Sequence, residues 1–320
     1  KMNTVIIDGL SFTLPLFIMA IGGIYSERSG ITNLALEGLQ GFGAFIGALM
    51  AVLLASHFSA NSQVPYYMAM LFAIIGGMAY ASIHALLCIK FKANQVISGV
   101  VINILAMALT TFLTKQINKG VFGASSDKFV LGVSSRWTVP GLSEIPIIGA
   151  VFTNIYPFEI IIIVIAVIAW YLLYQTKYGL HLRACGDNPH AVDAAGIDVA
   201  KVRFFAVLMS GALSGLAGIS FAYSISANFS SAIYVGYGYL AIAALIFGNW
   251  KILPTLGACL LFGFARSGGY RIVQLLQMPS SYSDLVMILP YALTLLLLIF
   301  FSKQNRAPRA LGEIYDKGKR

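Results

Sequence analysis

Apolar residues occur along this chain in long blocks, not in short alternating runs. Nine blocks approach the ~20 residues that cross a bilayer core as a helix: 5–24, 34–55, 66–89, 96–117, 151–174, 204–226, 236–250, 253–269 and 284–302. The blocks 236–250 and 253–269 are short and interrupted by Gly, Pro and Lys, so the pattern predicts eight to ten spans. Backbone in lipid must satisfy its own hydrogen bonds, and the alternation typical of a membrane β-barrel is missing. The pattern therefore predicts an all-α polytopic membrane protein of about nine helices, with 1–320 forming a single transmembrane domain.

Composition agrees with this class. Hydrophobic residues make up 58% of the chain and charged residues only 10%, against about 25% charged in soluble domains. An ordinary soluble protein is therefore excluded. Cys88, Cys185 and Cys259 are odd in number, and two of them lie in spans, so we expect no disulfide framework.

The net charge of +9 is compatible with nucleic-acid binding, but its distribution favours a membrane topology. If the polar loop near 176–203 faces the cytoplasm, fourteen Lys and Arg lie inside: Arg28, Lys90, Lys92, Lys177, Arg183, Lys201, Arg203, Lys251, Lys303, Arg306, Arg309, Lys317, Lys319 and Arg320. Seven lie outside or near the outer ends: Lys1, Lys115, Lys119, Lys128, Arg136, Arg266 and Arg271. This positive-inside bias predicts an outer N-terminus, an inner tail at 303–320 and no nucleic-acid partner.

Two polar stretches interrupt the apolar blocks. The stretch 118–150 is predicted to be extracytoplasmic, either as a cover that meets an external partner or as a plain structural loop. The stretch 175–203 is predicted to be a cytoplasmic loop with one short helix. Asn188 suits the N-cap, Pro189 the first helical position and Gly196 the left-handed residue beyond the last turn, which predicts a helix over 189–195. Asp198 then caps the next membrane helix. The short helix fits either a docking element or a surface turn.

Small residues recur at helix-packing spacing within the spans. Gly43 and Gly47 form one pair four residues apart, and Gly211 and Gly215 form another. Such pairs allow close approach of neighbouring helices, and a role as a gate or hinge is the second interpretation.

Ionisable and polar residues at membrane depth are costly unless they pair or face a cavity. Glu37 follows Asn33 by four residues, so the pattern predicts that both lie on one helix face. Glu37 then lines a pathway or makes an interhelical contact. His84, near the inner end of its span, is interpreted as a structural histidine.

The segment from Phe229 to Trp250 is rich in aromatic residues and interrupted by glycine. A helix broken in this way can present rings and backbone groups to a solute at mid-depth, which makes Tyr237, Tyr239 and Phe247 candidate pathway residues. The alternative is an aromatic belt at the membrane interface, above all for Tyr234 and Trp250. The chain has no HExxH, CxxC or GxSxG motif, so we expect no catalytic residue and no metal site.

Four blocks in colinear order resemble the permease subunits of bacterial nucleoside ABC importers, a group related to permeases for simple sugars and branched-chain amino acids. The blocks are GGIYSERSGITNLALEG at 22–38, NQVISG at 94–99 with Asn103, GLHLRACGDNP at 179–189 continued by AGI at 195–197, and GYLAIAALIFGNW at 238–250. Tyr237 stands where we expect Arg in this family.

The resemblance implies a type II importer permease in the bacterial cell (inner) membrane. It implies three partners: a second homologous permease, a cytoplasmic ATPase with two nucleotide-binding domains that holds ATP and Mg, and an extracytoplasmic substrate-binding protein, which in this family is often a lipoprotein. The residues expected to couple to the ATPase are Gly179, Arg183, Gly186, Asn188, Pro189, Ala191 and Gly196. The residues expected in the translocation pathway are Asn33, Glu37, Asn103, Tyr237, Tyr239 and Phe247.

The predicted function is passage of a nucleoside, without catalysis or a cofactor on this chain. Alternatives are a simple sugar, riboflavin or another small polar cargo in the same importer class. A secondary carrier or a membrane-embedded enzyme is a further alternative, supported by Glu37 and His84.

Overall fold

A computed structural model describes residues 2–59, 61–132, 134–146, 148–232, 234–279, 281–286, 288–301 and 306–318. The elements are, in chain order, α1 (Met2–Arg28), α2 (Leu36–Ala55), α3 (Val64–Ala85), the π-helix η1 (Leu86–Lys90), α4 (Gln95–Val121), β1 (Phe129–Val130), the 3₁₀ helix η2 (Ile148–Phe152), α5 (Pro157–Gln175), α6 (Lys177–Asp187), α7 (Pro189–Ala194), α8 (Val199–Ile225), β2 (Asn228–Phe229), α9 (Tyr237–Phe247), α10 (Ile252–Leu275), α11 (Ser281–Val286) and α12 (Leu289–Phe301).

The predicted all-α polytopic class is confirmed. In the described part of the chain, seven helices are long and apolar enough to cross a membrane: α1, α2, α3 with η1, α4, α5, α8 and α10. Two further predicted blocks form shorter apolar helices, α9 with 11 residues and α12 with 13 residues. At 1.5 Å per residue, α9 covers ~16 Å, about half of a hydrocarbon core.

Helices α1 and α8 lie at the centre of the bundle and are the most deeply buried spans, whereas α4 is the least buried. Close packing around α8 depends on glycine. A Cβ on Gly43 of α2 would lie 2.4 Å from the Gly215 Cα, and one on Gly77 of α3 would lie 2.2 Å from the Gly211 carbonyl oxygen. The predicted packing role of Gly43, Gly211 and Gly215 is confirmed, and Gly77 shares it, because any larger side chain would push the three helices apart.

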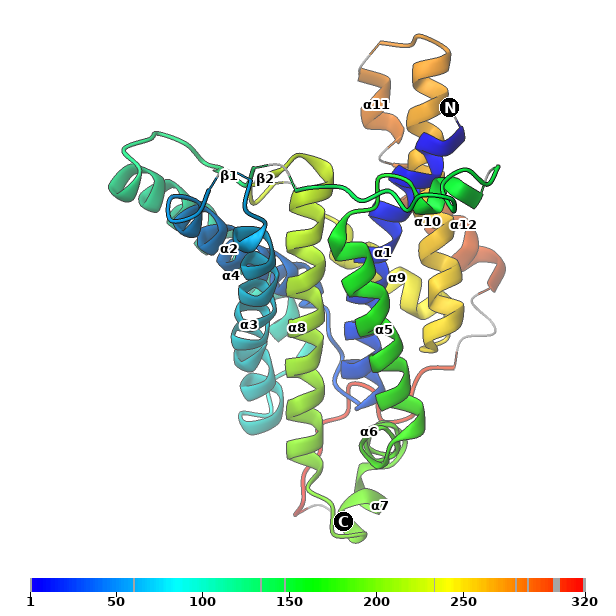
Figure 1. Cartoon of the computed structure of the whole chain (residues 1–320). Coiled ribbons are helices and arrows are strands. Elements are labelled where there is room, and N and C mark those ends of the chain that lie inside the picture. The colour runs from blue at the N-terminus through cyan, green and yellow to red at the C-terminus, as the bar shows by residue number, and fades with distance from the viewer. Residues whose placement is uncertain are drawn as a thin grey trace.

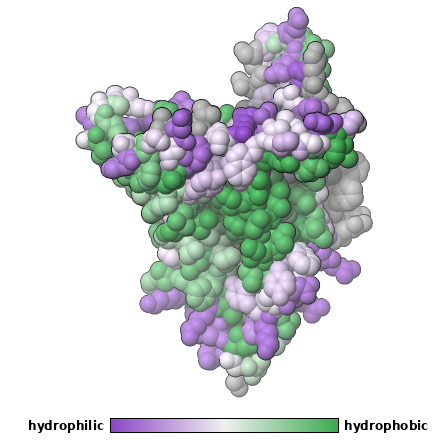
Figure 2. Space-filling model, viewed as in Figure 1, coloured by the Kyte–Doolittle hydropathy of each residue, from purple (hydrophilic) through white to green (hydrophobic). Residues whose placement is uncertain are grey.

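The two polar stretches lie at opposite ends of the molecule (Figure 1). The N-terminus and the segment 122–156 share one end, where β1 pairs antiparallel with β2, and α6, α7 and the C-terminus share the other. Figure 2 shows a band of hydrophobic atoms between these ends and hydrophilic atoms at both, as a membrane protein requires. Which end faces the cytoplasm stays a prediction. Four of the cations counted for it, Lys1, Lys303, Lys319 and Arg320, lie outside the described residues.

Candidate functional site

The short helix α7 is closed at both ends by the residues that the sequence suggested. The Asn188 side chain accepts a hydrogen bond from the Ala191 N–H at 3.1 Å, and Gly196 has a φ of +80°. Asp198 accepts from the Lys201 N–H at 3.1 Å and so caps α8. This hydrogen bond holds the pKa of the Asp198 carboxyl below its ordinary value. The predicted capped helix is confirmed.

The preceding helix α6 was not predicted. Thr176 caps it by accepting a hydrogen bond from the Gly179 N–H at 3.2 Å. Leu182 and Cys185 are buried on one face. The signal was present in the sequence, because a capping threonine precedes apolar residues at helical spacing (178, 182 and 185).

The C-terminal segment, residues 306–318, lies across the base of the bundle. The Ala310 N–H donates to the Gly186 carbonyl at 2.8 Å, and the Gly312 N–H donates to the Gly30 carbonyl at 3.0 Å. The first of these contacts joins the segment to α6 and the second to the turn between α1 and α2. The segment therefore connects the α6–α7 region to the core of the bundle.

Arg203, near the start of α8, is the buried centre of this region. The side chain is 2% exposed and donates to three backbone carbonyls: Ser29 at 3.0 Å, Glu313 at 3.1 Å and Cys185 at 3.4 Å. Those carbonyls belong to the α1–α2 turn, the C-terminal segment and α6 respectively. One guanidinium with five donors thus holds three chain segments together.

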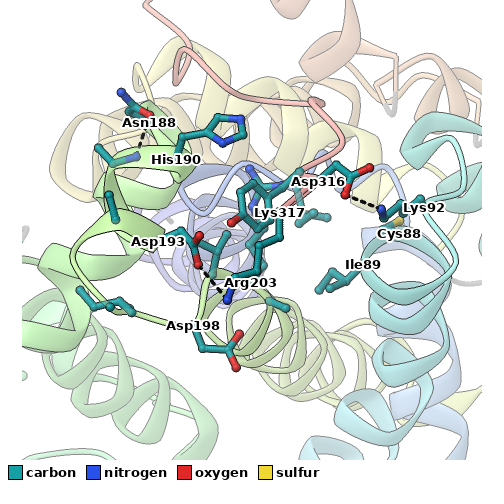
Figure 3. A pocket seen from close by; sticks show the side chains of 18 residues that line it. Cys88, Ile89, Lys92, Asn188, His190, Asp193, Asp198, Arg203, Asp316 and Lys317 are labelled. Atoms are coloured by element: carbon teal, nitrogen blue, oxygen red, sulfur yellow. Dashed lines mark hydrogen bonds and ion pairs between the residues drawn. The ribbon is translucent and has the colours of Figure 1, made fainter. Parts of the chain in front are cut away.

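A cleft of about 1170 Å³ opens beside α7, lined by η1, the start of α8 and the C-terminal segment (Figure 3). Two ion pairs cross its rim: Lys92 with Asp316 at 3.0 Å, and Asp193 with Lys317 at 3.6 Å. Both pairs are solvent-exposed to a degree that leaves each worth ~0–1 kcal/mol. The region beside α7 is therefore held mainly by the Arg203 hydrogen bonds to α6, the α1–α2 turn and the C-terminal segment, and by the backbone hydrogen bonds of that segment.

The predicted coupling residues differ in their exposure. Asn188, Ala191 and Gly196 are exposed, Arg183 is half-buried, and Gly179, Gly186 and Pro189 are buried. A Cβ on Gly186 would lie 2.2 Å from the Arg28 carbonyl oxygen. Gly186 therefore allows α6 to approach α1, and the exposed surface available to a partner is the α7 face around Ala191.

Glu37 joins α2 to α9. Its Oε1 accepts from the Gly236 N–H at 2.5 Å and its Oε2 from the Gly238 N–H at 2.9 Å. These N–H groups open α9, where Gly236 has a φ of +95°. A carboxylate at a helix N-terminus satisfies unpaired donors and complements the helix dipole. Of the two roles considered for Glu37, the contacts favour the interhelical one.

Asn33 does not share a helix face with Glu37, and that prediction was wrong. Helix α2 begins at Leu36, so Asn33 lies in the turn before it. Its Nδ2 donates to the Ser210 Oγ at 2.8 Å and its Oδ1 accepts from the Ala35 N–H at 3.1 Å. The spacing argument failed because the turn departs from helical geometry before the apolar block begins.

Asn103 and Tyr239 are in contact at the lateral surface of the bundle, where α4 and α9 lie next to each other. The Asn103 Nδ2 lies 3.3 Å from the Tyr239 hydroxyl, and its Oδ1 accepts from the Gly38 N–H at 2.7 Å. Tyr239 is 48% exposed. These two candidate pathway residues are therefore brought together at the surface of the single chain, next to α4, the least buried span.

Tyr237 is buried inside the chain instead, and Phe247 is half-buried against α10. The centroid of the Tyr237 ring lies 4.8 Å from that of Phe221 and 5.2 Å from that of Phe12. The ring centroids of Phe247 and Phe262 are 6.2 Å apart. The aromatic-belt interpretation of Tyr234 and Trp250 was wrong, since they are only 4% and 5% exposed.

The interpretation of His84 as a structural histidine is confirmed. It is fully buried, with Nδ1 2.8 Å from the Ser98 Oγ and Nε2 3.3 Å from the Thr32 carbonyl. Sequence reasoning missed another buried contact, in which the Trp250 Nε1 donates to the Glu27 Oε2 at 2.5 Å. The two residues are far apart in the sequence, and no local spacing signals the contact.

Comparison with known proteins decides the family. Residues 5–298 match the model described as branched-chain amino acid transport system, permease component. This chain belongs to that permease family. It is a multi-pass protein of the cell membrane and a transport subunit of the ABC class.

Three relatives carry more specific names. The chain is 37% identical to the guanosine ABC transporter permease protein NupQ of Bacillus subtilis, over 97% of this chain and 96% of NupQ. It is 36% identical to the nucleoside ABC transporter permease protein NupC of Lactococcus lactis, over 99% of this chain and 98% of NupC. It is 25% identical to the guanosine ABC transporter permease protein NupP of B. subtilis, over 95% of this chain and 82% of NupP. No solved structure matches the sequence significantly.

Proposed function

We propose that this permease forms, with a second permease subunit, the membrane pathway of an ATP-driven importer for a nucleoside. The observation that carries the proposal is the similarity of nearly the whole chain to two permeases named for guanosine and nucleoside transport. Full-length similarity matters because residues from α2, α4 and α9 meet in the candidate pathway region.

The pair formed by the half-buried Asn103 and the exposed Tyr239 supports a second permease as a partner. Polar groups that face lipid are costly, and they are tolerated where they face a bundle interior or a water-filled passage. A homologous subunit packed against α4 and α9 would enclose this pair at the interface. The similarity of one chain to both NupQ and NupP of a single organism is consistent with a pair of related permeases.

The α7 face supports a cytoplasmic ATPase as the second partner. Asn188, Ala191 and Gly196 are exposed on and beside a helix whose ends are fixed by the Asn188 cap and the left-handed Gly196. In this proposal α7 docks on an ATPase with two nucleotide-binding domains, which binds ATP and Mg, while this chain binds no cofactor and catalyses no reaction. An extracytoplasmic substrate-binding protein delivers the cargo at the opposite end.

The deciding experiment is reconstitution in proteoliposomes. The chain together with its sister permease, ATPase and binding protein should take up labelled guanosine or another nucleoside only with ATP. Glucose and riboflavin serve as competitors for the alternative cargoes. Absence of ATP-dependent uptake of labelled nucleoside, together with ATP-dependent uptake of labelled glucose or riboflavin, would refute the nucleoside assignment.

The same preparation separates an importer from a secondary carrier. The control is this chain alone in liposomes with an imposed proton gradient. Uptake by the chain alone would refute the proposal, because Glu37 and His84 would then support transport without an ATPase. The buried contacts of both side chains lead us to expect none.

A further inference from the structure

An apolar groove runs along the outside of the bundle between α1, α5 and α10. It has a volume of about 390 Å³, and no polar atom contributes to its lining. Leu14 and Phe17 of α1 form part of its wall, with Ala166 and Val167 of α5 and Leu256 of α10. The groove lies within the apolar band of the molecule and has the shape and chemistry that a hydrocarbon chain requires.

A second groove of about 400 Å³ continues from the first toward the α7 end of the molecule. Trp170 and Leu253 line both grooves, which makes them continuous. Arg28, Arg183 and Lys251 are also among its lining residues. The apolar passage thus ends beside three cationic residues.

These cations are not neutralised by carboxylates within the described part of the chain, where the ion pairs are Lys92–Asp316, Lys201–Asp198 and Lys317–Asp193. Arg28 donates to the Trp250 carbonyl and Arg183 to the Gly179 carbonyl, which leaves the charges uncompensated. Asp187 lines a neighbouring cleft, where it is outnumbered by Arg28, Lys251, Arg306 and Arg309. The positive charge at this level calls for an anion from outside the chain.

Aromatic residues mark the level at which apolar and charged surfaces meet. Trp170 lies beside Tyr174, with ring centroids 6.1 Å apart, and the Arg183 guanidinium lies 5.5 Å from the Tyr174 ring centroid. Such rings concentrate at the headgroup level of a bilayer. Arg183, predicted to contact the ATPase, therefore lies in this groove rather than on the α7 face.

We propose that the two grooves bind one anionic phospholipid of the cytoplasmic leaflet, with an acyl chain between α1, α5 and α10 and its phosphate beside Arg28, Arg183 and Lys251. Charge complementarity identifies the occupant, because the apolar groove and the cations together match one molecule with an acyl chain and an anionic headgroup. Basic pockets between helices at the cytoplasmic surface favour such headgroups. The site does not depend on the identity of the cargo.

Trp170 provides a direct probe. The full-length chain is placed in phosphatidylcholine nanodiscs that contain increasing fractions of phosphatidylglycerol with brominated acyl chains, and tryptophan quenching is measured. The signal of Trp170 is the difference between the wild type and Trp170→Phe, which removes the contribution of Trp137 and Trp250. We expect half-maximal quenching at a several-fold lower mole fraction of brominated phosphatidylglycerol than of brominated phosphatidylcholine.

Variants test the two halves of the site. Arg183→Gln and Lys251→Gln should each reduce the preference for the anionic lipid about fivefold, whereas Lys177→Gln, an exposed cation outside the grooves, should leave it unchanged. Val167→Phe should block acyl-chain entry and lower quenching by both lipids, and Val164→Phe on the same helix is its control.

Three outcomes would overturn the proposal. Equal quenching by the two lipids in the wild type would show that the cations select no headgroup. Absence of quenching by both lipids would show that protein, not lipid, covers the grooves. An anionic preference that persists in the Arg183→Gln, Lys251→Gln double variant would place the selective site elsewhere.

Discussion

The Oε1 of Glu37 lies 2.5 Å from the backbone nitrogen of Gly236, although 199 positions separate the two residues in the sequence. The contact fixes the start of α9, a helix that crosses only part of the bundle, to the first turn of α2. Since the other carboxylate oxygen accepts from Gly238, both acceptors are occupied by one helix terminus. The position of α9 therefore depends on a full carboxylate at position 37.

Replacement of Glu37 by Gln should destabilise the chain. Gln has a single acceptor oxygen, and its amide group would face a backbone donor, so one buried N–H would lose its partner at a cost of ~1–3 kcal/mol. We expect a lower midpoint of thermal unfolding for the purified variant. Glu144→Gln, at an exposed position, is the control. Unchanged stability with altered cargo affinity would instead favour Glu37 as a pathway residue.

Loss of the α7 cap should weaken coupling more than folding. Asn188→Ala removes the acceptor for the Ala191 N–H, which costs about 1 kcal/mol of helix stability. In the reconstituted importer, we expect uptake per ATP hydrolysed to fall several-fold while ATP hydrolysis continues. Asn188→Asp preserves an acceptor oxygen and should retain coupling. If both variants behave like the wild type, the order of α7 does not limit coupling.

Arg203 should be the most sensitive polar position at the α7 end. Arg203→Lys retains the charge but not the fork that reaches Ser29, Cys185 and Glu313. Hydrogen bonds to charged groups contribute ~1.5–3 kcal/mol each, so loss of two should lower thermal stability clearly. The C-terminal segment should also become accessible to protease. Lys201→Gln, on the exposed side of the same turn, should have neither effect, and equal protease resistance would contradict the role assigned to Arg203.

Two glycines offer a matched test of close approach. In Gly186→Ala the new Cβ would lie 2.2 Å from the Arg28 carbonyl oxygen, so α6 must shift. Overpacking of this kind costs ~1–3 kcal/mol, and we expect lower stability and lower uptake. Nothing lies within 4 Å of a Cβ at Gly257, so Gly257→Ala should be neutral or stabilising. Similar thermal unfolding of the two variants would show that α6 need not approach α1.

Features that depend on neighbouring residues were predictable from the sequence. Apolar blocks specified the polytopic helical class because lipid exposure and span length act on each segment separately. The caps at Asn188, Gly196 and Asp198 were predictable because their hydrogen bonds and backbone angles involve only the next few residues. Helix α6 was missed even though a local signal for it existed.

Tertiary structure alone decided which of these features form a site. Arg203 donates to Ser29, 174 positions away, and to Glu313, 110 positions away, so no local spacing in the sequence predicts either contact. The role of Glu37 likewise depends on α9 starting beside it. Asn33 lies in the turn before α2, not on a helix face, and its side chain donates a hydrogen bond to Ser210 of α8. Local hydropathy and capping act over a few residues, whereas these contacts arise only when the whole bundle packs and buried polar groups must find partners on distant segments.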